Sequence, residues 1–278
     1  MTVIVYGDFN CPYSYVASQR ADLLSRMGTA VDWRAVEHDR GLAVTGGNPD
    51  QHRAAWDREL TEVASLALPG EHVPGAPPRL ISNTKAAVAA YAEAVSDGVA
   101  DELRRRLFAA IWVQGLHLSS ADAVRRLITA VMWPAEDITD RLASPDFPSL
   151  LLRDTDLARI VRRSGGTIAQ DGGPLTTAGW RRIQRWRQEW LALPSQVIPV
   201  VIGPDHIARS GAGALRYLAG LASARDASAR DASAGGVGAG GVAPRGVRPP
   251  TPTLAHADAG ARGNDIWRTR NLAHAETT

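Results

Sequence analysis

A strand, a helix and a second strand follow one another within the first 36 residues. Residues 3–6 are a short β-branched and aromatic run, and residues 7–10 interrupt it. Pro12 suits the first turn of a helix whose apolar residues continue at helical spacing until Gly28. Residues 30–36 then have the composition of another strand. A strand–helix–strand unit of this size requires parallel strands, so the chain begins as an α/β protein.

Beyond this unit the chain changes to a long helical block and then returns to strands. Apolar residues recur at helical spacing in residues 51–66, 83–96, 99–114, 120–130, 134–142, 150–163 and 178–191. A strand follows at residues 196–202, then a second short strand near Ile207, then a helix over residues 211–221. The order βαβ, helices, ββα predicts a thioredoxin-like α/β fold with a large all-helical insertion domain.

These patterns also set the domain boundaries. Residues 1–39 and 194–221 are the N-terminal and C-terminal parts of the predicted thioredoxin-like domain, and residues 40–193 are the helical insertion domain. Residues 222–278 contain a five-residue direct repeat, a Gly/Ala/Val stretch and a Pro-rich segment. Such a composition buries too little apolar surface to offset the entropy of ordering. We therefore expect residues 222–278 to be a disordered low-complexity tail.

The charge and hydropathy of the chain exclude several classes of partner. The net charge is +2, and the tail holds seven Arg against five acidic residues, so the first 221 residues carry 24 of each sign. No basic stripe interleaved with aromatic residues occurs, so we expect no nucleic-acid partner. No apolar run reaches the roughly 18 residues of a membrane span, and no signal peptide precedes the first strand. We expect a cytoplasmic protein with no membrane partner.

The single cysteine, Cys11, lies where the first strand gives way to the first helix, in the segment Cys11-Pro12-Tyr13-Ser14. One cysteine cannot form an intrachain disulfide or a Cys-rich zinc site, and the histidines lack metal-ligand spacing, so we expect no metal. The free N–H groups and dipole of a helix N-terminus favour a thiolate, and Ser14, one turn further on, can hydrogen-bond to it. We expect Cys11 to be acidic and reactive, although free cysteine is also common as an inert core residue.

Pro199 is the second informative residue, because a proline inside a strand lacks the N–H that a sheet requires. A cis bond between Ile198 and Pro199, facing Cys11, would explain it and would leave the Ile198 backbone free to pair with an extended thiol-bearing substrate. A trans proline at the start of the strand is the alternative, and the low frequency of cis bonds favours it when the strand is considered alone.

Five short motifs together resemble the DsbA-like thioredoxin superfamily. They are residues 8–15 around Cys11, the Ser82-Asn83-Thr84 segment before an Ala-rich helix, residues 106–110, residues 197–201 and the Ser210-Gly211-Ala212 turn. The chain looks closest to FrnE-type oxidoreductases, with kappa-class glutathione transferases and 2-hydroxychromene-2-carboxylate isomerases as cousins. The resemblance covers residues 1–221 and implies a nucleophilic Cys11, a cis Pro199 beside it and a helical insertion that covers the cleft.

Two departures from these families restrict the mechanism. FrnE-type proteins usually have a second cysteine where this chain has Ser14, so a two-cysteine oxidant cycle is not available. The glutathione-dependent cousins usually have serine in place of Cys11, and a Ser-Asp pair that binds the γ-glutamyl end of glutathione where this chain has Ala212 and Gly213. The second departure weakens the case for glutathione as a cofactor.

The leading hypothesis is a DsbA-like thiol-disulfide oxidoreductase with a monothiol CxxS site, which forms a mixed disulfide that an external thiol resolves. Its expected substrate is a protein or small-molecule thiol or disulfide, with no bound cofactor and with glutathione as a candidate co-substrate. The alternatives are a glutathione-dependent transferase or isomerase of a small aromatic or polyketide-like substrate, and a partner-binding protein without catalysis. A homodimer is one candidate assembly, because relatives commonly dimerise. The expected site residues are Cys11 and Ser14 for catalysis, and Pro12, Tyr13, Ile198 and Pro199 for substrate binding.

Overall fold

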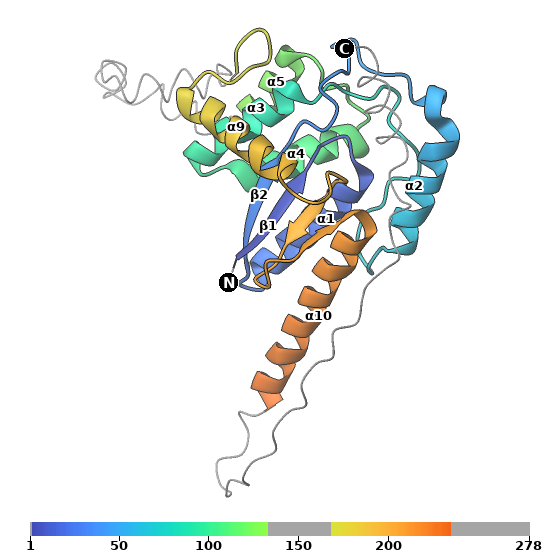
Figure 1. Cartoon of the computed structure of the whole chain (residues 1–278), viewed down its shortest axis with the longest axis vertical. Coiled ribbons are helices and arrows are strands. Elements are labelled where there is room, and N and C mark those ends of the chain that lie inside the picture. The colour runs from blue at the N-terminus through green and yellow to red at the C-terminus, as the bar shows by residue number, and fades with distance from the viewer. Residues whose placement is uncertain (1, 133–167, 235–278) are drawn as a thin grey trace, which may run out of the picture.

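The structure is a computed structural model that describes residues 2–132 and 168–234 (Figure 1). The helices predicted at residues 134–142 and 150–163 lie outside these ranges, and so does the tail from residue 235 onward. No helix within the described ranges is both long enough and apolar enough to cross a membrane.

A four-stranded sheet with the order β2-β1-β3-β4 lies at the centre of the molecule. The strands β1 (Thr2–Gly7) and β2 (Ala30–Ala35) are parallel, because the helix α1 (Pro12–Arg26) carries the chain back between them. The strands β3 (Val200–Ile202) and β4 (Ala208–Ser210) are antiparallel to their neighbours. The βαβ and ββα units that the sequence predicts therefore share one sheet.

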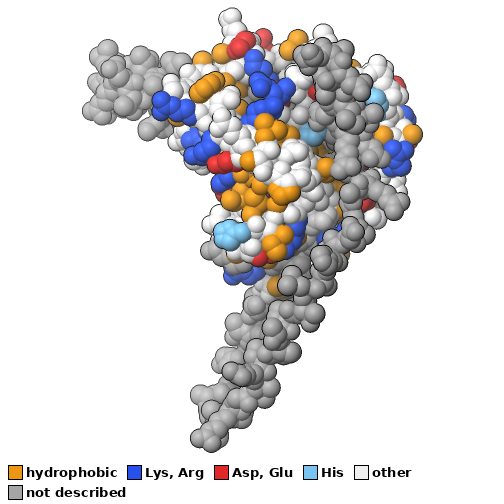
Figure 2. Space-filling model, viewed as in Figure 1, with side chains coloured by type: hydrophobic (Ala, Val, Ile, Leu, Met, Phe, Trp, Pro, Cys, Tyr) orange, Lys and Arg blue, Asp and Glu red, His pale blue; other side chains and the backbone are white. Residues whose placement is uncertain are grey.

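The two faces of this sheet have different coverings. Side chains alternate between the two faces of a strand. On the face toward which a Cβ at Gly7 would point, the nearest side chains are Trp33 of β2 and Ser14 of α1. On the other face, Arg34 donates to Glu189 at 2.6 Å, in the helix α9 (Thr177–Leu191). Figure 2 shows hydrophobic side chains gathered over the strands, with Lys and Arg side chains above them.

The helices of the insertion divide into two groups. The helices α3 (Lys85–Asp97), α4 (Ala100–Trp112), α5 (Ala121–Met132) and α9 lie together at one end of the sheet in Figure 1. The helix α3 packs against α4, α5 and α9, and its residues 86–94 are all buried. Most of these residues are alanines, whose small side chains let the neighbouring helices approach closely. The helix α2 (Arg53–Ser65) lies apart, against α1 and the short helix η1 (Pro49–His52).

The last helix, α10 (Gly211–Ala234), corrects the predicted start of the tail. We expected disorder from residue 222, whereas α10 continues through both copies of the five-residue repeat. Each copy reads Ser-Ala-Arg-Asp-Ala, and Ala and Arg are among the best helix formers. The helix α10 packs on α1, and Arg20 of α1 donates to the Leu215 carbonyl of α10. Composition alone therefore places the end of the ordered chain too early, because a low-complexity segment that follows a packed helix can continue that helix.

Candidate functional site

Cys11 occupies the N-cap position of α1. Its backbone is extended (φ −90°, ψ 124°), and Pro12 follows in the first helical turn. The turn between β1 and α1 is closed by the Cys11 N–H, which donates to the Asp8 carbonyl at 3.2 Å. The Cys11 carbonyl then accepts the first bond of the helix, from the Tyr15 N–H at 3.0 Å. The only cysteine thus lies at the strand-to-helix junction, as its place in the sequence indicates.

The structure brings Cys11 together with Ser14, Ile198 and Pro199. The Cys11 Sγ lies 3.6 Å from the Ile198 carbonyl oxygen, and the Ile198–Pro199 peptide bond is cis. Pro199 is joined to the start of α10, since its carbonyl accepts from the Gly211 N–H at 2.9 Å. Ser14 is fully buried, and its hydroxyl and N–H lower the pKa of the Cys11 thiol. Three of the other five predicted site residues, Ser14, Ile198 and Pro199, therefore lie beside the sulfur of Cys11.

Pro12 and Tyr13, which we expected to bind substrate, are both buried under neighbouring structure. The Tyr13 hydroxyl donates to Glu62 Oε2 at 2.6 Å, and Glu62 belongs to α2. The ring of Tyr13 therefore holds α2 against the N-terminus of α1 in this conformation.

The predicted acidity of Cys11 is wrong for this conformation of the protein. Complete burial raises the pKa of the Cys11 thiol to about 12, and the Glu59 and Asp8 carboxylates raise it further. The hydroxyl and N–H of Ser14 lower the pKa but do not offset the loss of solvation. The dipole at the N-terminus of α1 is real, but its effect is smaller than the cost of a charge with no water contact.

Aromatic side chains fix the loop that carries Cys11. The Trp112 indole N–H, at the end of α4, donates to the Phe9 carbonyl at 2.9 Å. Tyr15 stacks on Trp112 with an interplanar angle of 11°, and Trp56 of α2 lies 6.2 Å from Trp112 between ring centroids. The insertion therefore contributes directly to the site from both α2 and α4.

A buried carboxylate, Asp8, ties the same loop to two other segments, and sequence reasoning missed it. Asp8 Oδ2 accepts from the His38 N–H at 2.8 Å, and Oδ1 accepts from the Asn10 N–H at 3.3 Å. Burial raises the pKa of Asp8 to about 6, against hydrogen bonds from His38, Thr84 and Asn10 that lower it. The side chain of Asn10 donates to the Ser82 carbonyl. The sequence shows the segment with Asp8 and the Ser82-Asn83-Thr84 segment as two separate motifs. Only the fold shows that these two segments contact each other.

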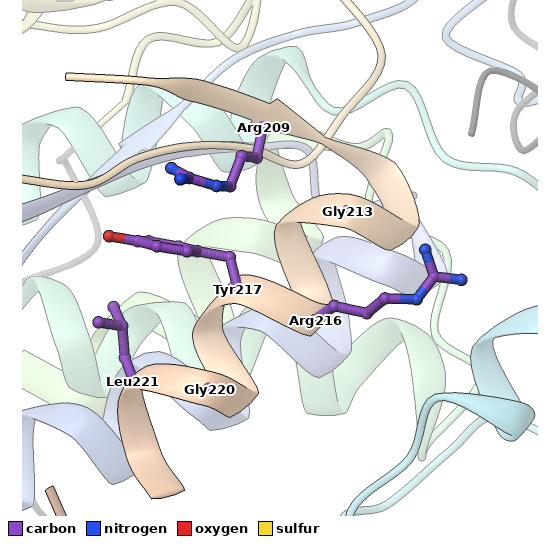
Figure 3. A pocket seen from close by; sticks show the side chains of 6 residues that line it. All are labelled: Arg209, Gly213, Arg216, Tyr217, Gly220 and Leu221. Carbon is purple, nitrogen blue, oxygen red and sulfur yellow. The ribbon is translucent and has the colours of Figure 1, made fainter. Parts of the chain in front are cut away.

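The outer face of α10 carries a shallow hollow of about 620 Å³ that is separate from Cys11 (Figure 3). The Arg209 guanidinium lies 3.9 Å above the Tyr217 ring centroid within it. Its lining includes none of the predicted site residues. Across the described ranges, no group of three or more His, Cys, Asp or Glu side chains is arranged to hold a metal ion.

Comparisons with known proteins identify the family and the fold of the chain. Residues 2–165 match the sequence model of the family described as DSBA-like thioredoxin domain. The structure is similar to the cytosolic disulfide reductase DsbM from Pseudomonas aeruginosa, solved with GSH, at 14% identity and a TM-score of 0.50, over 83% of this chain and 100% of that one. It is also similar to a probable DsbA oxidoreductase from Streptomyces coelicolor (16% identity, TM-score 0.49, 95% and 97% coverage).

A 2-hydroxychromene-2-carboxylate isomerase is a further structural neighbour, at 16% identity and a TM-score of 0.48 over 84% of this chain and 98% of that one. No curated protein sequence matches the chain. The family match and the shared architecture confirm the predicted thioredoxin-like fold, whereas likeness at such low identity does not assign an activity. The narrower FrnE-type branch stays a prediction.

Proposed function

This chain belongs to the DSBA-like thioredoxin domain family, and we propose that it is a thiol-disulfide oxidoreductase that works through one cysteine, Cys11. The observation that carries the proposal is the position of the only cysteine at the N-terminus of α1, with its sulfur against Ile198 and beside Pro199. The family supports an oxidoreductase, and the described DsbM neighbour is a disulfide reductase.

The reaction has three exchange steps, and Cys11 takes part in the first two. The Cys11 thiolate attacks one sulfur of a substrate disulfide, so a Cys11–substrate disulfide forms and the other sulfur leaves as a thiolate that takes up a proton. An external thiol, deprotonated as it attacks, then displaces Cys11 from this mixed disulfide and regenerates it. A second external thiol then attacks the disulfide between the first external thiol and the substrate, so the two external thiols leave as one disulfide and the substrate leaves fully reduced. Ser14 cannot resolve the mixed disulfide, because a hydroxyl does not exchange with disulfides.

Two neighbours of Cys11 have roles in this scheme. The hydroxyl and N–H of Ser14 hydrogen-bond to the thiolate and lower its pKa, so they stabilise the attacking and leaving form of Cys11. The Ile198 carbonyl accepts from the thiol in the resting state, and this hydrogen bond is lost when the proton leaves.

Because Cys11 is fully buried, a disulfide reaches the sulfur only after part of its cover moves. The helix α2 is the candidate, since its main packing is against α1 and η1, and the Tyr13–Glu62 hydrogen bond links it to the site. Movement of α2 restores solvation to the sulfur and lowers the pKa of Cys11 toward its usual value.

Glutathione is the candidate external thiol in this proposal. The DsbM neighbour was solved with GSH and is described as cytosolic, which also fits the expectation of a cytoplasmic protein. The isomerase or transferase alternative requires glutathione to stay bound without exchange, and it predicts no covalent adduct on Cys11.

The full-length protein tests the proposal when it is mixed with cystamine and its mass is measured before and after addition of glutathione. We expect an adduct of one cysteamine on Cys11, which glutathione removes, and steady disulfide reduction when glutathione is recycled enzymatically. Cys11→Ser should abolish both signals, and Ser14→Ala, the matched change one turn away, should slow the reaction without preventing the adduct. A Cys11→Ser variant that reduces disulfides as fast as the wild type would contradict the proposal.

A further inference from the structure

The helix α2 turns two acidic residues toward the N-terminus of α1. Glu59 is buried, with an exposed fraction of 4%, and Glu62 accepts the hydroxyl of Tyr13 at 2.6 Å. They are three residues apart, so they lie on the same face of the helix. Both belong to the insertion, and neither is part of a motif around Cys11.

The contacts of α2 place Glu59 near the segment that carries Cys11. One turn before Glu59, Trp56 packs at 6.2 Å from Trp112, whose indole N–H is bonded to the carbonyl of Phe9. One turn after Glu59, Glu62 is bonded to Tyr13. The helix is thus bonded directly to Tyr13, two residues after Cys11, and it packs on Trp112, which in turn bonds to Phe9. Glu59 lies between these two contacts of α2.

Electrostatic interactions with the sulfur agree with this placement. After burial, the Glu59 carboxylate has the largest effect in raising the pKa of Cys11, and Asp8 adds to it from the β1–α1 turn. The charge of Glu59 also helps to raise the pKa of Tyr13, together with burial and Glu62. The charged groups that act most strongly on the sulfur are therefore negative.

We propose that Glu59 makes the Cys11 site selective by charge, so that disulfides flanked by basic or uncharged groups react faster than anionic ones. The inference rests on the proposed function, because it concerns the partner of the same thiol. A carboxylate about 6 Å from a reagent's charge, at an effective dielectric constant of about 20, changes the rate on the order of a hundredfold, and solvent and salt reduce this to about tenfold. Glutathione disulfide, which is anionic, is then a slow substrate, whereas a disulfide beside Lys or Arg is a fast one.

Two methanethiosulfonate reagents of equal length test this, one ending in trimethylammonium and the other in sulfonate. In both, the Cys11 thiolate attacks the sulfenyl sulfur, a new S–S bond forms and methanesulfinate leaves. The readout is the ratio of the two rate constants on the full-length protein, divided by the same ratio for free β-mercaptoethanol. The thiolate fraction of Cys11 affects both reagents equally, so it cancels in this ratio. A movement of α2 that carries Glu59 away from the sulfur would lower the ratio toward one.

We expect the normalised ratio to favour the cationic reagent by about tenfold or more, and to fall toward one in Glu59→Gln. The matched control is Asp57→Asn, which removes the same charge from the exposed face of the same helix and should leave the ratio unchanged. In the wild type, raising the ionic strength from about 0.05 M to about 0.5 M should lower the ratio, a measurement that does not depend on any variant folding.

A wild-type ratio near one, or a ratio that Glu59→Gln leaves unchanged, would overturn the inference and leave the proposed function intact. If Glu59→Gln slows both reagents equally, Glu59 accepts the thiol proton and does not select by charge. If neither reagent modifies Cys11 in the folded protein, while both modify it in urea, the proposed function itself fails together with the inference.

Discussion

The burial of Cys11 predicts a thiol that reacts slowly while the protein is folded. Its pKa is raised from 9.0 to about 12, first by burial and then by Glu59. At pH 8 the thiolate fraction is then about a thousandfold smaller than in the unfolded chain. The same difference corresponds to about 4 kcal/mol of stability, because each tenfold step is worth about 1.4 kcal/mol.

The direction of the pKa shift determines the pH range over which this stability is lost. The pKa of Cys11 is higher in the folded protein than in the unfolded chain, so the contribution is complete below pH 9 and disappears as the pH rises toward 12. The free energy of unfolding should therefore fall with pH over this range. Cys11→Ser lacks the titrating thiol and should be less sensitive to pH.

The rate of alkylation with iodoacetamide measures the thiolate fraction of Cys11. We expect native Cys11 to react about a thousandfold more slowly than the same residue in urea at pH 8, with a rate that rises about tenfold per pH unit and reaches no plateau below about pH 10. Urea unfolding at pH 8 and pH 10.5 measures the pH dependence of stability. Between these pH values the free energy of unfolding of the wild type should fall by about 2 kcal/mol more than that of Cys11→Ser. A native rate equal to that in urea, with a plateau near pH 7, would show that the helix dipole outweighs burial and would refute the reasoning.

Two further predictions concern buried groups around the site and in the helices. Burial raises the pKa of Asp8 to about 6, so the contribution of Asp8 to stability is lost as the pH rises from about 4 through 6. Burial lowers the pKa of His38 to about 4, so the contribution of His38 is lost as the pH falls from 6.5 through 4. The two slopes oppose each other, and Asp8→Asn should leave a free energy of unfolding that rises with pH by about 3 kcal/mol; a urea-unfolding profile identical to that of the wild type would contradict this. Gly179→Ala would place a Cβ against the buried Glu93 carboxylate and should cost about 1–3 kcal/mol in thermal unfolding, whereas the matched Gly220→Ala, in open space on α10, should gain about 0.5–1 kcal/mol. Equal melting temperatures for these two variants would contradict the close packing of Gly179, in α9, against Glu93 of α3.

Local patterns determined much of the fold in advance. The strand β1, the helix α1 and the strand β2 have nearly the predicted bounds, because their periodicity and their Pro and Gly boundaries lie within a few residues. The length of α10 was not predicted, since the repeat beyond residue 221 has no apolar face of its own and depends on the packed helix before it.

The site was predictable in position but not in its electrostatics. The junction of β1 and α1 identifies Cys11, and the proline inside a strand identifies residue 199, because both signals are short-range. The pKa of Cys11 depends on Glu59, which is 48 positions away in another helix, and on complete burial, which is a property of the packed molecule. A helix dipole can be inferred from local sequence, whereas loss of solvation cannot.

The pairing of β1 with β3 has a consequence for how the protein acquires its chemistry during synthesis. Cys11 and Ile198 meet across 187 positions of sequence, whereas the contacts between β1, α1 and β2 are local. Long-range pairings form after local ones, because they must first close a long loop. A growing chain therefore displays Cys11 as an ordinary exposed thiol until its C-terminal strands are made. The high pKa of the finished protein is acquired late, and oxidants that reach the nascent chain meet a far more reactive cysteine than the folded protein presents.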